Sequence, residues 1–158
     1  MLSDPWLQRW LALAVSHAGD GPVLEIGCGH GDDTAVLAGA GLKAIVTRAC
    51  NVYGPGQQHY RLIPKLIASI KKGIPFPLEG GGTSARSWVY IDDLCAAYEI
   101  LGRYGDPGEA YHIATPGTYT TGEIVARVVD MMGGPAQIEH LPERPGKDAK
   151  YWLDTMRI

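Results

Sequence analysis

Short apolar runs alternate with amphipathic stretches along most of this chain. The apolar runs have the composition of buried strands and cover residues 22–27, 43–48, 87–91, 109–114 and 136–141. The amphipathic stretches predict helices over about residues 5–17, 32–40, 62–72, 92–103 and 121–132. Strands that alternate with helices in this way predict an α/β fold built on a small, mostly parallel sheet with flanking helices.

Local signals at two helix starts support this assignment. Thr120 or Thr121 can cap the last helix, with Glu123 near the position that completes a capping box. Asp92 and Asp93 open the preceding helix, where acidic side chains favour the positive end of the helix dipole. That position explains the two carboxylates better than a paired acid–base site does.

Composition and charge narrow the classes of function. The chain has 158 residues, of which 46% are hydrophobic and 20% are charged, and this is enough for one domain with a sizeable core. We therefore expect a single α/β domain over residues 1–158. The net charge is −3, so the chain lacks the basic surface that nucleic acid or an anionic membrane requires.

The cysteines and the N-terminal segment indicate a cytoplasmic protein. The three cysteines are widely spaced and form no C-x-x-C pair, so we expect neither a metal site nor a disulfide framework. A redox pair of Cys28 and Cys50 has no other feature to support it. The first 15 residues are amphipathic, lack a basic start and are too short to span a bilayer, so they predict a helix rather than a signal peptide.

A glycine-rich loop follows the first predicted strand and precedes a predicted helix. The stretch GPVLEIGCGHGDDTAVLAGAG contains the pattern E-x-G-x-G-x-G and resembles the class I S-adenosylmethionine-dependent methyltransferases over about residues 1–40. The resemblance implies S-adenosylmethionine as a candidate cofactor, with contacts from Glu25, Gly27, Gly29 and Gly31. The family's acidic residue at the end of the second strand is absent, because that strand ends at Arg48. The alternative is that the loop serves only as a strand–turn–helix joint.

From about residue 38 onward the chain resembles a different family. The segments AGLKAIVTRACNVYGPGQ, RLIPKLIASIKKGIPFPLEGGGTSARSWVYIDDLCAAY, GEAYHIATPGTYTTGEIV and ERPGKDAKYWLDTMRI occur in the same order as in the C-terminal half of NAD-dependent sugar-nucleotide epimerases and dehydratases. Among these, the nucleoside-diphosphate-glucose 4,6-dehydratases are the most similar. The resemblance implies a nucleoside-diphosphate sugar as the candidate ligand. Independently, the segment NVYGPGQQH is dense in glycine and proline and is predicted to be a loop.

Six residues fall at positions that this second resemblance assigns to substrate binding: Asn51, Arg61, Arg86, His112, Arg144 and Lys147. Arg86 and Arg144 match the arginines that bind the diphosphate, and a diphosphate requires such fixed cations. Arg61, His112 and Lys147 depart from the residue types that are usual at their positions. Each arginine alone could equally be a solvated surface charge.

The hydride chemistry of the epimerases and dehydratases is not supported by this sequence. None of the eight tyrosines has a lysine four residues later, and the N-terminal glycine motif for NAD is absent. The letters from Gly102 to Gly108 spell G-x-x-G-x-x-G, but they follow a helix rather than a strand, which indicates coincidence. We therefore predict no catalytic residues and no NAD binding without the missing N-terminal half.

The chain is interpreted as a hybrid of two doubly wound parents, with a small Rossmann-like sheet. Residues 1–40 would form the methyltransferase-like segment and residues 41–158 the epimerase/dehydratase-like segment. Three hypotheses stay open: a non-catalytic nucleotide-sugar binding domain, an S-adenosylmethionine-dependent methyltransferase, and a folded chimera without a ligand. Exposed sheet edges also suggest a homo-oligomer that covers them.

Overall fold

The computed structural model describes residues 23–26, 41–146 and 148–156. The helices predicted over about residues 5–17 and 32–40 therefore lie outside the described residues. Contacts within the chain divide it into two compact units. The first unit comprises residues 1–49, 93–113 and 155–158, and the second comprises residues 50–92 and 114–154. The prediction of a single domain over residues 1–158 stays a prediction.

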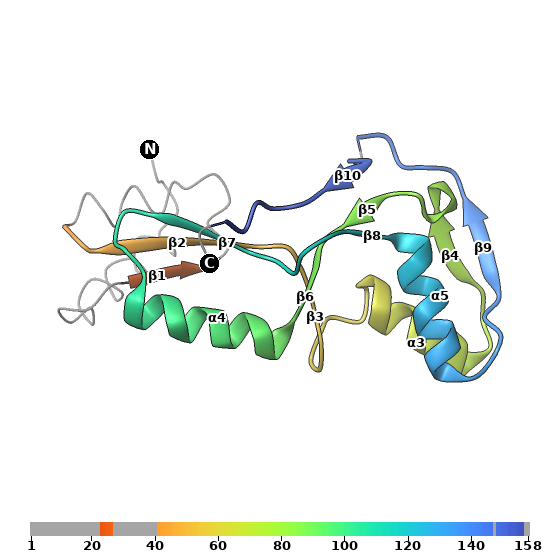
Figure 1. Cartoon of the computed structure of the whole chain (residues 1–158). Helices are drawn as coiled ribbons and strands as arrows, with labels where there is room; N and C mark the ends of the chain where they lie inside the picture. The colour runs from red at the N-terminus through yellow and green to blue at the C-terminus, as the bar shows by residue number, and fades with distance from the viewer. Residues whose placement is uncertain (1–22, 27–40, 147, 157–158) are drawn as a thin grey trace, which may run out of the picture. The chain divides into compact units, whose positions relative to one another are not determined.

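The first unit contains a parallel three-stranded sheet. Its strands are β1 (Val23–Ile26), β2 (Ala44–Ala49) and β7 (Ala110–Ile113), in the order β1-β2-β7. Helix α4 (Ile91–Tyr104) continues into this unit and runs along the sheet (Figure 1). The three apolar runs that predict these strands are confirmed, as is the parallel arrangement, because buried parallel strands carry nearly continuous apolar sequence.

The core of the first unit is centred on β2. Ile45 and Thr47 are fully buried, and Leu94 and Leu101 from α4 are each 5% exposed. The Thr47 hydroxyl hydrogen-bonds to Tyr98 of α4, whose pKa is raised because burial disfavours the charged phenolate. Burial of these apolar side chains supplies most of the stabilisation between helix and sheet.

The second unit is built around a pair of helices and a parallel strand pair. Helices α3 (Leu62–Lys72) and α5 (Thr121–Met132) lie side by side next to β4 (Phe76–Glu79) and β9 (Ile138–Leu141), as Figure 1 shows. The core cluster of this unit takes one or two side chains from each of α3, β4 and α5: Leu66, Phe76, Leu78 and Val125. This cluster fixes the end of β4 relative to both helices.

Several short strands complete the second unit. β3 (Asn51–Tyr53) pairs in parallel with β6 (Trp88–Tyr90). The segment NVYGPGQQH is therefore not a loop throughout, because its first three residues form β3. β5 (Ala85–Arg86) lies between β10 (Lys150–Tyr151) and β8 (Tyr119–Thr120), and the three-residue helix η1 (Gly80–Gly82) links β4 to β5.

A capping box begins α5. The backbone N–H of Glu123 donates to the Thr120 hydroxyl at 3.1 Å, and the Thr120 N–H donates to Glu123 Oε2 at 2.7 Å. The Thr120 N–H, and at 2.9 Å the Thr120 hydroxyl, donate to the Glu123 carboxylate and lower its pKa because they favour the charged form. Of the two threonines that the sequence offers, Thr120 is thus the cap.

Within the described part of the chain, no helix has the length and apolar composition needed to cross a bilayer.

Candidate functional site

Two adjoining cavities in the second unit contain most of the polar side chains that the sequence analysis singles out. The loop cavity, of about 480 Å³, is lined mainly by the segment from Cys50 to Gln58, together with Arg61. The arginine cavity, of about 340 Å³, is lined by two arginines and a lysine among other residues. The cavities share Asn51, Leu62 and Trp88, so one extended ligand could contact both.

Backbone carbonyl groups hold the side chain of Arg86 in the arginine cavity. From β5, its Nη1 donates to the Ala85 carbonyl at 2.8 Å and its Nη2 donates to the Asp148 carbonyl at 2.6 Å. Both acceptors are neutral, so these bonds orient the guanidinium without neutralising its charge. Arg86 is therefore a pre-oriented cation, which is the kind of group that binds phosphate oxygens well.

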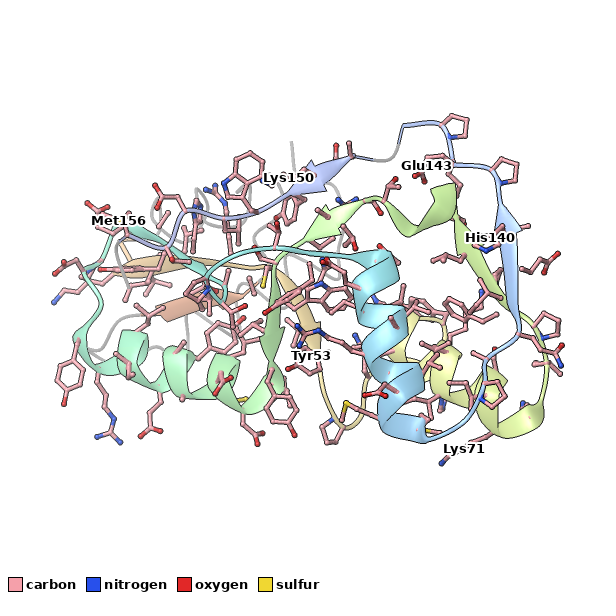
Figure 2. All side chains as sticks on the ribbon, turned by 45° about the vertical axis from the view of Figure 1, so that its right-hand side comes forward. Tyr53, Lys71, His140, Glu143, Lys150 and Met156 are labelled. Carbon is pink, nitrogen blue, oxygen red and sulfur yellow. The ribbon has the colours of Figure 1, made fainter. Side chains whose placement is uncertain are left out.

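Arg144 lines the same cavity from the segment after β9. Its Nε donates to Glu79 Oε2 at 2.8 Å, and the side chains of Arg144 and Glu79 are 71% and 28% exposed. Glu79 ends β4 and is followed by Gly80, whose backbone lies so close to the Glu143 carboxylate that any side chain at residue 80 would overlap it. Figure 2 shows Glu143 beside this turn. Residues Glu143 and Arg144 thus pack against the end of β4.

The arginine cavity carries a formal positive charge. Among the described residues, its lining contains three cationic side chains, Lys65, Arg86 and Arg144, and one carboxylate, Glu79, which together give a sum of +2. The hydroxyl groups of Ser84 and Thr121, 3.1 Å apart, also line it. These hydroxyl groups bond to each other and Thr121 donates to the Ser84 carbonyl at 3.1 Å, so the cationic side chains are the groups suited to an anion with several oxygen atoms.

The loop cavity contains two buried polar atoms without a hydrogen-bond partner in the described structure. Gln57 donates from Nε2 to the Val52 carbonyl at 2.7 Å, which orients its amide and leaves Oε1 without a donor. The indole Nε1 of Trp88, a residue that is 9% exposed, has no acceptor. Both atoms are closed to solvent, so their missing hydrogen bonds are a local cost of the fold and not contacts offered to a ligand in the cavity.

The structure brings together four of the six predicted substrate residues. Asn51 lines both cavities, where its Nδ2 donates to the Ser87 carbonyl at 3.4 Å. Arg86 and Arg144 line the arginine cavity, and Arg61 lines the loop cavity. His112 lies on β7 of the first unit, opposite Arg48, and lines neither cavity. Lys147 lies outside the described residues.

The predicted S-adenosylmethionine contacts lie largely outside the described structure. Glu25 belongs to β1, where it is paired with Val46 of β2. Gly27, Gly29 and Gly31 are not among the described residues. The role of these four residues therefore stays a prediction.

The structure adds residues that sequence reasoning does not single out. Lys65 lies one helical turn after Arg61, and that spacing places both on one side of α3, which is a signal that could have identified it. In β4, Phe76 and Leu78 face the core, so the alternation of the strand places Glu79 on the opposite face, away from the core. Gln57 carries no such signal, because it lies in an irregular loop.

The glycines from Gly102 to Gly108 do not fit a dinucleotide. They lie at the C-terminal end of α4 and in the turn after it, where the Gly105 N–H donates to the Leu101 carbonyl at 2.9 Å. A dinucleotide pyrophosphate binds at a helix N-terminus, which presents free N–H groups, whereas a C-terminus presents carbonyls. The segment from Gly102 to Gly108 therefore does not present the N–H groups that a pyrophosphate requires. The described residues also contain no group of three or more His, Cys, Asp or Glu side chains that could hold a metal ion.

Cys50 lines the loop cavity but is a poor nucleophile. Burial raises the pKa of its thiol to about 11, because the charged thiolate is disfavoured away from water. We expect iodoacetamide at about pH 8 to label exposed Cys95 quickly and Cys50 slowly, since about one Cys50 thiol in a thousand is then ionised. Peptide mass mapping of a time course measures both rates. Equal rates would contradict the burial of Cys50.

Comparison with known proteins identifies relatives of this chain. A model described as the NAD dependent epimerase/dehydratase family matches residues 34–114, which is about half of the chain. A low-salt glycan biosynthesis protein, Agl12 of Haloferax volcanii, is 36% identical over 117 residues, covering 73% of this chain and 38% of that protein. A dTDP-glucose 4,6-dehydratase of Streptomyces niveus is 36% identical over 119 residues, covering 75% and 35%. The chain thus spans little more than a third of the length of these relatives.

Solved structures of similar fold belong to the same kind of enzyme. The crystal structure of DesIV, a dTDP-glucose 4,6-dehydratase of Streptomyces venezuelae with NAD bound, superposes with a TM-score of 0.79 at 27% identity, covering 94% of this chain and 56% of that one. A UDP-glucose 4-epimerase of Thermotoga maritima, with UDP-glucose, gives a TM-score of 0.72 at 27% identity, covering 78% and 41%. The predicted Rossmann-like α/β class and the second resemblance are confirmed. The resemblance to methyltransferases stays a prediction.

Proposed function

Because this chain belongs to the NAD-dependent epimerase/dehydratase family, we propose that its second unit binds a nucleoside-diphosphate sugar without catalysing a reaction on its own. One observation carries the proposal. Asn51, Arg86 and Arg144, which the sequence resemblance assigns to substrate binding, come from three separate segments of the chain and line a single cavity. One amide and two cationic side chains from unrelated surface positions would not be expected to converge in this way.

The diphosphate would occupy the arginine cavity. The guanidinium of Arg86 is already fixed by two carbonyl groups, so little side-chain entropy is lost when it binds a phosphate. Arg144 and Lys65 add charge at the rim, where both are exposed. A formal sum of +2 matches the charge of about −2 that a diphosphate diester carries near neutral pH.

The sugar would extend into the loop cavity. A sugar hydroxyl group both donates and accepts hydrogen bonds, and the lining of the loop cavity includes Asn51, Gln58 and Arg61, whose side chains can pair with it. Asn51 lines both cavities and would contact the ligand where they meet. A ligand that is anionic at one end and rich in hydroxyl groups at the other is a nucleotide sugar in chemical class.

The absence of catalysis is part of the proposal. None of the eight tyrosines has a lysine four residues later, and Gly102–Gly108 offers no seat for a dinucleotide. The residues present can bind and orient a diphosphate, but they include no identified group that accepts a hydride or activates a phenol. The chain would therefore act as the substrate-binding part of such a site.

A thermal-shift panel tests the proposal, with dTDP-glucose, UDP-glucose, NAD and S-adenosylhomocysteine as separate ligands. We expect a nucleotide sugar at about 100 times its dissociation constant to add about 2.7 kcal/mol to the unfolding free energy, and NAD to add nothing. A rise with S-adenosylhomocysteine alone would move the function to the Gly27–Gly31 loop. No rise with any ligand would favour a folded chimera without a ligand and would refute the proposal.

A further inference from the structure

Glu79 is the one acidic side chain among the described residues that line the arginine cavity. Its place there is set by the strand, because β4 alternates and its Phe76 and Leu78 side chains are buried in the core. The Glu79 carboxylate is 28% exposed and accepts from Arg144 Nε at 2.8 Å. A site that binds diphosphate through cations thus also contains a fixed negative charge.

This charge has different consequences for two chemically related ligands. A diphosphate that is esterified at both ends, as in a nucleotide sugar, carries about −2 at pH 8, whereas a free nucleoside diphosphate carries about −3 because its terminal phosphate is fully ionised. The formal charge of the cavity, +2, balances the first ligand but not the second. The additional negative charge would face the Glu79 carboxylate, and the described lining residues include no cation beyond Lys65, Arg86 and Arg144 to compensate it.

We propose that Glu79 is a specificity-determining residue that makes the arginine cavity select diphosphate diesters over free nucleoside diphosphates. The inference rests on the proposed function, because it assumes that the diphosphate binds beside Arg86 and Arg144. The ion pair with Glu79 offsets part of the positive charge of Arg144. The positive charge that remains in the cavity balances a diphosphate diester. With Glu79 in the arginine cavity, the chain would keep a nucleotide sugar bound in the presence of the nucleoside diphosphate that sugar-transfer reactions release.

The test compares Glu79→Gln with the wild-type chain by isothermal titration calorimetry, using dTDP and dTDP-glucose as the two probes. Glutamine keeps the size and an acceptor for Arg144 but removes the charge. We expect the affinity for dTDP to rise about threefold or more relative to the affinity for dTDP-glucose, measured at about pH 8 and about 50 mM salt. At about 500 mM salt the change should shrink, because screening weakens charge effects at a partly exposed site.

Glu99→Gln is the matched control. Glu99 is also in an ion pair, with Arg103 at 2.7 Å, but it lies on α4 and lines neither cavity. This control should leave the ratio of the two affinities unchanged, and a thermal melt of each variant verifies that it is folded.

The outcomes separate the two proposals. If both probes bind to the wild type and Glu79→Gln leaves the ratio of their affinities unchanged, the selectivity inference is wrong and the diphosphate site stands. If the ratio changes equally in Glu99→Gln, a general charge effect explains it and the inference is again wrong. If neither probe binds to the wild type, the proposed function and this inference both fail.

Discussion

Replacing Arg86 with glutamine is expected to weaken the binding of dTDP-glucose by about 30-fold, which corresponds to about 2 kcal/mol. Arg86 is the cation of the arginine cavity that two backbone carbonyls orient, at 2.8 and 2.6 Å, and no ion pair in the described structure reduces its charge. Hydrogen bonds between a guanidinium and phosphate oxygens are charge-assisted, so their loss is more costly than the loss of neutral ones. Isothermal titration calorimetry at one fixed salt concentration measures the change.

Two further variants make this expectation specific. Arg103→Gln removes the same charge from an exposed ion pair on α4 and should leave the affinity unchanged. Arg86→Lys keeps the charge but loses the planar fork of donors, so its affinity should fall between those of the wild type and Arg86→Gln. If Arg86→Gln binds dTDP-glucose as tightly as the wild type while the thermal melt is unchanged, the arginine cavity is not the diphosphate site.

How far the sequence predicts this site depends on the kind of signal. Asn51, Arg86 and Arg144 are predicted because each lies in a segment that resembles the family in sequence and order. Their convergence on one cavity follows from the packing of β3, β5 and the segment after β9, which no local pattern encodes. Glu79 is missed for the same reason, since its importance arises from a contact with Arg144 that is 65 residues away in the chain.

In the fold, too, elements with a local sequence signal are predicted, and elements that depend on distant partners are not. The bounds predicted for α3, residues 62–72, are confirmed, because Lys71 and Lys72 precede a glycine in the left-handed conformation that ends the helix. The strands β3 and β5 are missed, because strands of three and two residues are too short to show an alternating pattern. They exist only through their partners β6, β8 and β10.

Strands β1 and β2 form a pair although the sequence resembles methyltransferases before about residue 40 and epimerases and dehydratases after it. The two strands lie on opposite sides of that change and form a parallel pair with Val23 opposite Ala44 and Ile26 opposite Thr47. Parallel pairing of apolar strands depends on backbone geometry and on burial rather than on a shared origin. A strand from a methyltransferase-like segment can therefore complete the sheet of an epimerase-like one.

The largest expected effect on stability comes from Gly82→Ala, which should lower the unfolding free energy by about 2–5 kcal/mol. Gly82 is buried in η1 at a φ of +74°, where an alanine would be strained. A Cβ there would also lie 2.9 Å from Cα and N of Gly122, at the start of α5. Both atoms belong to the backbone, so relief requires movement of the helix rather than rotation of a side chain.

The variant Gly81→Ala separates the effect of backbone strain from the effect of the overlap with Gly122. Gly81 also has a positive φ, +61°, but its Cβ would meet nothing within 4 Å, so only the backbone strain of about 1–2 kcal/mol should appear. Urea denaturation followed by circular dichroism measures both variants. Since Thr121 precedes Gly122 and lines the arginine cavity, Gly82→Ala should also weaken dTDP-glucose binding, whereas Gly81→Ala should not. Equal losses of stability in the two variants would mean that η1 and α5 do not pack as closely as described, and that strain alone determines the need for glycine here.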